Sequence, residues 1–142
     1  GYPNISDETA ILKAKASRKN APEVNSVMTA EDLVSLRNAA EEVHVSDEIY
    51  DYIARLSAAT RADKRLELGV SIRGSISAAK MAKCSALFRG RDFVTPDDVR
   101  YVYTDVCAHR VIPARVKGKQ LSDSEVKTVL DDICKGVAAP EI

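Results

Sequence analysis

The sequence is poor in aromatic residues and has no excess of either charge. Trp is absent, and Phe, Trp and Tyr together make up 5% of the 142 residues. Ala, Leu, Val and Ile are left to build the core, a composition that favours helix-on-helix packing. Lys and Arg number 21, Asp and Glu number 21, and the formal net charge is zero. This balance argues against a general nucleic-acid-binding or membrane-surface protein, because any anion binding must be local.

Catalytic motifs are also missing. The chain has no G-x-x-x-x-G-K-[ST] loop and no apolar strand ending in acidic residues, so it lacks a phosphate cradle and a Mg²⁺ and water site of its own. No serine has a G-x-S-x-G context. His44 and His109 stand far apart without Cys or acid at ligand spacing, which predicts neither a metal site nor a catalytic histidine. We expect this chain alone to be catalytically inactive.

Cysteine is scarce and long apolar runs are absent. Cys84, Cys107 and Cys134 form an odd set without C-x-x-C spacing. Buried, reduced thiols are therefore a simpler interpretation than a metal or redox pair, and they indicate a cytoplasmic location. No apolar run is long enough for a membrane span, and no secretion signal is present. The absence of a starting Met before Gly1 hints at a piece of a longer protein.

Periodicity and capping signals predict an all-α bundle of five to six helices. The expected helices cover residues 6–19, 29–43, 46–61, 72–89, 96–107 and 122–135. The 72–89 helix is predicted to be central, because its small residues permit close approach of neighbouring helices. Residues 61–69 are interpreted as an exposed loop, and no strand pattern of useful length appears. A short hairpin within residues 110–120 is left open.

Capping residues mark several helix starts. Thr95-Pro96-Asp97-Asp98 is the most specific signal, since it combines an N-cap Thr, a first-position Pro and an acid at the third position. Capping boxes are predicted at Thr29–Asp32 and at Ser122–Glu125, and Ser6 is expected to cap the first helix. One face of the second helix carries Leu33, Leu36, Ala40 and Val43, and this face is predicted to be buried.

The helix expected at residue 72 differs from the others in the charge of its first turn. The other five open with Asp or Glu, which offset the partial positive charge of the free N–H groups by about 0.3–1 kcal/mol. The sixth has Arg73 and no acid. A phosphate would satisfy both the arginine and the amides. Alternatively, Arg73 pairs with Glu67 or with an acid on another helix, in a surface bridge worth about 0–1 kcal/mol.

A second basic stretch lies between residues 110 and 119, with Arg110, Arg115, Lys117 and Lys119. One interpretation is a nucleic-acid contact. The other, which we favour, is a solvated loop, because no stacking aromatic residues lie between the charges. A stand-alone helical module that binds protein or nucleic acid is accordingly kept as the alternative function.

Four blocks of the sequence agree in order and spacing with one protein family. They are Val43 to Ile53, Ala59-Thr60-Arg61, Leu68-Gly69-Val70-Ser71-Ile72-Arg73-Gly74-Ser75, and Gly90-Arg91-Asp92-Phe93-Val94-Thr95-Pro96-Asp97-Asp98-Val99. Together they resemble the C-terminal lid of the MoxR-family AAA+ ATPases. The resemblance covers residues 1 to about 113 and, loosely, the tail to residue 142. It implies a hinge and first helix over 1–28, a helical lid over 29–113, and a C-terminal helix packing on the lid over 114–142.

The resemblance also implies a role for Arg73. The block from Gly69 to Arg73 corresponds to G-A-S-P-R in the family, where the arginine is the sensor 2 residue that contacts the γ-phosphate of ATP. Gly69 and Ser71 then belong to the supporting loop, which Arg61 also helps to shape. In this chain Val70 replaces the usual Ala, and the residue before Arg73 is Ile where the family has Pro. The lost Pro loosens the helix start but leaves the arginine in place.

Cofactor and partners are implied in the same way. Mg-ATP would be bound mainly by a core domain that this chain lacks, and none is expected on the isolated fragment. The implied partners are that core, the neighbouring subunits of a hexamer, and client proteins, among them ones with von Willebrand factor A domains, which the ring remodels like a chaperone. Neither a membrane nor a nucleic acid is expected as a partner. Whether Arg73 serves its own subunit or a neighbour is left open.

Overall fold

The computed structural model describes residues 2–16, 24–116 and 119–141. The chain divides into two compact units, Gly1–Asp32 and Leu33–Ile142. In the first unit, helix α1 (Ile5–Ala16) has no buried residue. Asn4 caps this helix, since its side-chain Oδ1 accepts from the amide of Asp7 at 2.8 Å. The prediction of Ser6 as the cap was therefore wrong, because Ser6 already lies inside the helix; residues 17–19 lie outside the described residues.

Helix α2 (Ala30–Glu42) begins with the predicted capping box. The amide of Thr29 donates to Asp32 Oδ2 at 2.8 Å, and the amide of Asp32 donates to Thr29 Oγ1 at 3.1 Å. The predicted burial of its apolar face is wrong. Leu33 and Leu36 are 51% and 39% exposed, no residue between 30 and 42 is buried, and only Val43, just beyond the helix, enters the core.

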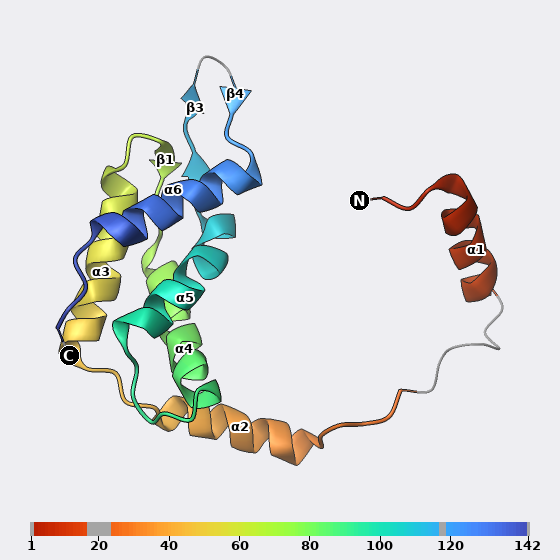
Figure 1. Ribbon diagram of the computed structural model, residues 1–142, viewed down its shortest axis with the longest axis horizontal. Helices are drawn as coiled ribbons and strands as arrows, with labels where there is room; N and C mark the ends of the chain where they lie inside the picture. Colours follow the sequence, from red (N-terminus) through yellow and green to blue (C-terminus); the bar gives the residue numbers. More distant parts are fainter. Residues whose placement is uncertain (1, 17–23, 117–118, 142) are drawn as a thin grey trace. The chain divides into compact units, whose positions relative to one another are not determined.

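The second unit is a bundle of helices, which confirms the all-α prediction. Its helices are α3 (Asp47–Ala62), α4 (Ile72–Phe88), α5 (Pro96–Cys107) and α6 (Asp123–Gly136), with a short 3-10 helix, η2 (Ala108–Arg110), after α5. Helix α5 packs against α3, α4 and α6 (Figure 1). The prediction that α4 is central was wrong in this respect, because α5 holds that place and α4 leaves Ile76, Met81 and Phe88 exposed.

The core is formed by the apolar faces of α3, α4, α5 and α6. Helix α4 contributes small side chains, Ala78, Ala82 and Ala86, all fully buried. Close helix approach follows from their size, and α5 lies against them. The larger buried side chains of α3, α5 and α6 are Ile49, Tyr52, Ile53, Leu56, Val99, Val102, Tyr103, Val126, Val129, Leu130 and Ile133.

Two short strand pairs connect the helices. Strand β1 (Leu66–Leu68) pairs antiparallel with β2 (Ile112–Pro113), and Leu66 is buried. This pairing overturns the prediction of an exposed loop over residues 61–69, because β1 gains a partner more than 40 residues later in the chain. Strands β3 (Arg115–Val116) and β4 (Lys119–Gln120) form an antiparallel hairpin within residues 110–120, and the hairpin projects away from the helices (Figure 1).

The connection from α4 to α5 is fixed by a buried carboxylate. Asp98 has no exposed side-chain surface, and its two oxygens accept from Arg91 Nη1 and Nη2 at 2.7 and 2.8 Å. Ser85 Oγ of α4 donates to it at 3.0 Å, and the amide and hydroxyl of Thr95 each donate at 2.9 Å. Although burial alone raises the pKa of Asp98, the donors from Arg91, Thr95 and Ser85 outweigh it and hold that pKa well below its usual range. The T-P-D-D signal thus starts α5 as predicted and also locks its start to α4.

Candidate functional site

The site predicted from sequence lies where α3 passes through β1 and residues 69–71 into α4. Gly69 packs directly on the backbone of α3, since a Cβ at this position would lie 2.6 Å from the amide nitrogen of Arg61. Val70 is fully buried, and its amide donates to Thr60 Oγ1 at 2.9 Å. Arg61 Nε donates to the carbonyl of Val70 at 2.8 Å. The last turn of α3 therefore sets the path of the chain into α4.

Ser71 and Gly74 shape the first turn of α4. Ser71 is the N-cap, and its Oγ accepts from the amide of Gly74 at 3.4 Å. Gly74 is buried, and a Cβ there would lie 2.6 Å from Val70 Cγ1, so only glycine leaves room for Val70 beneath the helix start. The outward amides that begin a helix have no intrahelical acceptor and point towards solvent or a ligand.

Arg73 occupies the second position of α4 and is exposed. Neither the hydrogen bonds nor the ion pairs of the described residues include its guanidinium, and the alternative pairing with Glu67 is not formed. No acidic residue lies in the first turn of α4. An exposed cation thus lies beside the positive end of a helix, an arrangement that an anion stabilises. Arg73, Gly69, Ser71 and Arg61 lie together in this corner.

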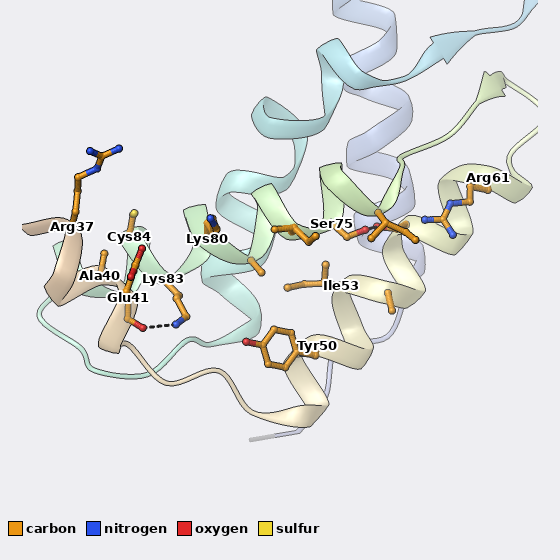
Figure 2. Close-up of a pocket in the computed structure, with 15 residues that line it drawn as sticks. Arg37, Ala40, Glu41, Tyr50, Ile53, Arg61, Ser75, Lys80, Lys83 and Cys84 are labelled. Carbon is orange, nitrogen blue, oxygen red and sulfur yellow. Dashed lines mark hydrogen bonds between the residues drawn. The ribbon is translucent and has the colours of Figure 1, made fainter.

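A groove of about 880 Å³ lies between α2, α3 and α4. Its apolar lining includes Ile53, Ile76 and Ala79, and its cations are Arg37, Arg61, Lys80 and Lys83. Figure 2 shows Arg61 and Ser75 towards one end of this groove, and Arg37 and Glu41 towards the other. At the latter end Lys83 Nζ donates to the carbonyl of Glu41 at 2.7 Å. The groove therefore opens next to the first turn of α4, although Arg73 does not line it.

The second basic stretch is only partly a solvated loop. Arg110 Nε donates to the carbonyl of Val106 at 3.1 Å, and its Cδ lies 3.6 Å from where a Cβ on Gly74 would be. Its aliphatic stem thus covers the start of α4, a contact that sequence reasoning missed. Arg115 lies in β3 and is exposed. Lys117 and the side chain of Lys119 fall outside the described residues.

Buried hydroxyls beneath the corner were also missed. Ser57 and Tyr103 are 1% and 0% exposed and lie within hydrogen-bonding distance of each other. A signal was available for Ser57, because it follows the apolar Ile53 by four residues and so lies on the same helix face. A polar side chain at such a position requires a partner.

The described residues do not form a metal site or a reactive thiol pair. Within the described ranges no group of three or more His, Cys, Asp or Glu could hold a metal ion. The three cysteines are free; Cys107 and Cys134 are buried, and Cys84 is half-buried. Burial raises the pKa of the Cys107 thiol to about 12 and that of Cys134 to about 11, so both are poor nucleophiles at neutral pH. No helix among residues 2–16, 24–116 and 119–141 has the length and apolar character to span a bilayer.

Comparisons with known proteins point to one family. The family model of the AAA lid domain matches residues 58–133, which is more than half of the chain and runs from α3 into α6. The uncharacterized protein YeaC of Bacillus subtilis is 30% identical over 143 residues, covering 99% of this chain and 43% of YeaC. Chaperone MoxR1 of Mycobacterium tuberculosis is 29% identical over 152 residues, covering 100% of this chain and 39% of MoxR1.

A solved structure agrees at the level of the fold. The crystal structure of a candidate ATPase from Cytophaga hutchinsonii is similar with a TM-score of 0.73 at 23% identity, covering 99% of this chain and 45% of that one. The chain spans less than half the length of the curated relatives it matches. Because the family model covers more than half of the chain, including the start of α4, the chain belongs to the AAA lid domain family.

Proposed function

We propose that this chain is the lid of a longer AAA+ ATPase and that Arg73 is its sensor 2 residue, which binds the γ-phosphate of ATP. The observation that carries this proposal is the state of Arg73, which is exposed at the second position of α4 and forms no ion pair with any described residue. The free amides beside it and the absence of an acid in this turn add to the local positive potential. A terminal phosphate supplies the missing charge.

The same arrangement couples the lid to the nucleotide. When ATP is bound by the core domain, Arg73 contacts the γ-phosphate and holds the lid in one position. Hydrolysis removes that contact and releases the lid, so the lid position follows the state of the nucleotide. The loop of Gly69 and Ser71 supports the arginine, and Arg61 anchors this loop through the carbonyl of Val70.

Assembly and substrates follow from the family. In this proposal residues 1–28 lead from the core, residues 29–113 form the lid, and residues 114–142 end it with α6. The parent protein forms a hexameric ring in the cytoplasm and remodels client proteins, among them ones with von Willebrand factor A domains. The similarity to chaperone MoxR1 supports such a remodelling role. Free and largely buried thiols fit a reducing compartment.

Replacement of Arg73 in the full-length parent tests the proposal. Arg73→Ala should lower the rate of ATP hydrolysis about 10-fold to 100-fold, because a charged donor to the reacting phosphate is lost. Thermal unfolding of the lid should change little, since an exposed side chain is removed. Lys64→Ala is the matched control, because Lys64 is an exposed cation in the same α3–α4 connection and has no partner among the described residues. Unchanged hydrolysis in Arg73→Ala would refute the role of Arg73.

A further inference from the structure

A line of hydroxyl groups runs from the centre of the bundle to the first turn of α4. Tyr103 Oη of α5 lies 3.2 Å from Ser57 Oγ of α3, and Ser57 Oγ lies 2.8 Å from Ser75 Oγ of α4. Ser75 Oγ in turn donates to the carbonyl of Ser71 at 3.4 Å. These four residues connect three helices. The side chains of Tyr103 and Ser57 are buried, that of Ser75 is half-buried, and Ser71 takes part through its carbonyl.

Hydrogen bonds link the members of this line one after another. Ser75 Oγ donates to the carbonyl of Ser71, which can only accept. Between Ser57 and Ser75, and between Ser57 and Tyr103, either hydroxyl can be the donor. The line ends on the N-cap carbonyl of α4. Loss of any member leaves a neighbour without its partner.

Arg73 lies between the two residues that this line holds. Ser75 is bound on its side chain by Ser57 and on its amide by the carbonyl of Ser71, at 3.1 Å. The cap bond that Ser71 Oγ accepts from the amide of Gly74 is long, at 3.4 Å. The link from Ser57 to Ser75 is shorter, at 2.8 Å, so it holds the first turn more firmly than the cap does. Figure 2 shows Ser75 on α4 at the same end of the groove as Arg61.

From these contacts we infer that Ser57 is a positioning residue for Arg73. Through Ser75 it sets the orientation of the first turn of α4, and hence the place where the guanidinium of Arg73 meets the terminal phosphate. Tyr103 anchors Ser57 from the core. This inference rests on the proposed role of Arg73 and extends it to residues that never touch the nucleotide. Its signature is a loss of discrimination between ATP and ADP, because only ATP carries the phosphate that Arg73 contacts.

Affinities of the full-length parent for ADP and for a non-hydrolysable ATP analogue test the inference in four variants. Arg73→Ala should reduce the ratio of the two affinities about 10-fold to 100-fold, as loss of a charged phosphate contact does. Ser75→Ala and Ser57→Ala should each reduce it about 3-fold to 10-fold, since a small misplacement of a binding group is costly. ADP affinity should stay within about 2-fold of wild type in all of them.

Ser85→Ala is the matched control. Ser85 is another buried serine of α4, and its hydroxyl donates to Asp98 at 3.0 Å near the opposite end of the helix. It therefore also loses one hydroxyl bond between helices, but without touching the first turn. Ser75 is only half-buried, so Ser75→Ala leaves the Ser57–Tyr103 pair in the core and carries the test even where Ser57→Ala unfolds the lid.

Each outcome decides one question. A loss of discrimination in Ser57→Ala and Ser75→Ala with normal discrimination in Ser85→Ala supports the inference. A wild-type ratio in Ser75→Ala and Ser57→Ala, with a reduced ratio in Arg73→Ala, overturns the inference and leaves the role of Arg73 intact. An equal loss in Ser85→Ala also overturns it, because the effect is then one of general lid stability. A wild-type ratio in Arg73→Ala refutes the proposed function itself.

Discussion

The two ends of α4 use arginine in opposite ways. At its C-terminal end, Arg89 and Arg91 both lie within 4 Å of Asp98, and Arg91 binds this buried carboxylate with two short hydrogen bonds. At its N-terminal end, Arg73 is exposed and forms no ion pair with any described residue. The arginines at the C-terminal end form an ion pair inside the chain. Arg73, at the N-terminal end, is left for a partner that the chain does not supply.

Replacement of Asp98 should give the largest effect at the C-terminal end of α4. Asp98→Asn keeps the shape of the side chain but leaves Arg91 without its counter-charge, which should lower the free energy of unfolding by about 3–5 kcal/mol. Urea denaturation of the chain measures this change. Asp97→Asn is the control, because Asp97 is 79% exposed and 3.8 Å from Arg100, so its loss should cost no more than about 0.5 kcal/mol. Equal effects of the two substitutions would contradict the contrast between the ends.

The pH dependence of this ion pair has a definite sign. The pKa of Asp98 is lower in the folded state than in the unfolded chain, so the folded protein holds its carboxylate ionised where the unfolded chain already binds a proton. The stabilisation is therefore present above about pH 4 and is lost as the pH falls further. The difference in unfolding free energy between wild type and Asp98→Asn should shrink between about pH 5 and pH 2. A constant difference over that range would assign the effect to packing alone.

A steric test applies at the N-terminal end. Gly69→Ala places a Cβ 2.6 Å from the backbone nitrogen of Arg61, and backbone cannot yield as a flexible side chain can. We expect a loss of about 1–3 kcal/mol in the free energy of unfolding. Gly136→Ala at the end of α6 is the control, since a Cβ there meets nothing within 4 Å, and it should be neutral or slightly stabilising. A Gly69→Ala variant as stable as wild type would show that the loop can move away from α3.

Local chemistry explains why so much of the fold could be predicted. The helix starts depend on contacts between residues three positions apart, such as Thr29 with Asp32 and Ser122 with Glu125, and both boxes are formed. The place of Arg73 in the first turn of its helix is local in the same sense. The pairing of β1 with β2 is not local. Its two members are two to three residues long and far apart in the chain, too short to show an alternating pattern.

Tertiary contacts account for the rest of what was missed. The apolar stripe on α2 indicated burial, but a stripe does not reveal whether a partner is present, and Leu33 and Leu36 are exposed. The bonds of Asp98 to Ser85 and of Ser57 to Tyr103 depend on how helices cross. The sequence could show only that Ser57 would need a partner, because this polar residue shares a helix face with the apolar Ile53. The assignment of Arg73 to a phosphate stays a prediction.

The smallest expected effect separates stability from function at Arg73. In the 142-residue chain, Arg73→Glu replaces a cation by an anion at the positive end of α4 and should raise the free energy of unfolding by about 0.3–1 kcal/mol at low salt. The gain should fade at about 1 M salt, where charges are screened beyond about 3 Å. In the parent protein the same substitution should abolish discrimination of ATP from ADP. An Arg73 with an internal partner would behave in the opposite way, because its replacement by Glu would destabilise the chain. If Arg73→Glu both raises stability and abolishes the response to the nucleotide, Arg73 serves a ligand. Arg89 and Arg91, at the other end of the same helix, instead serve the fold.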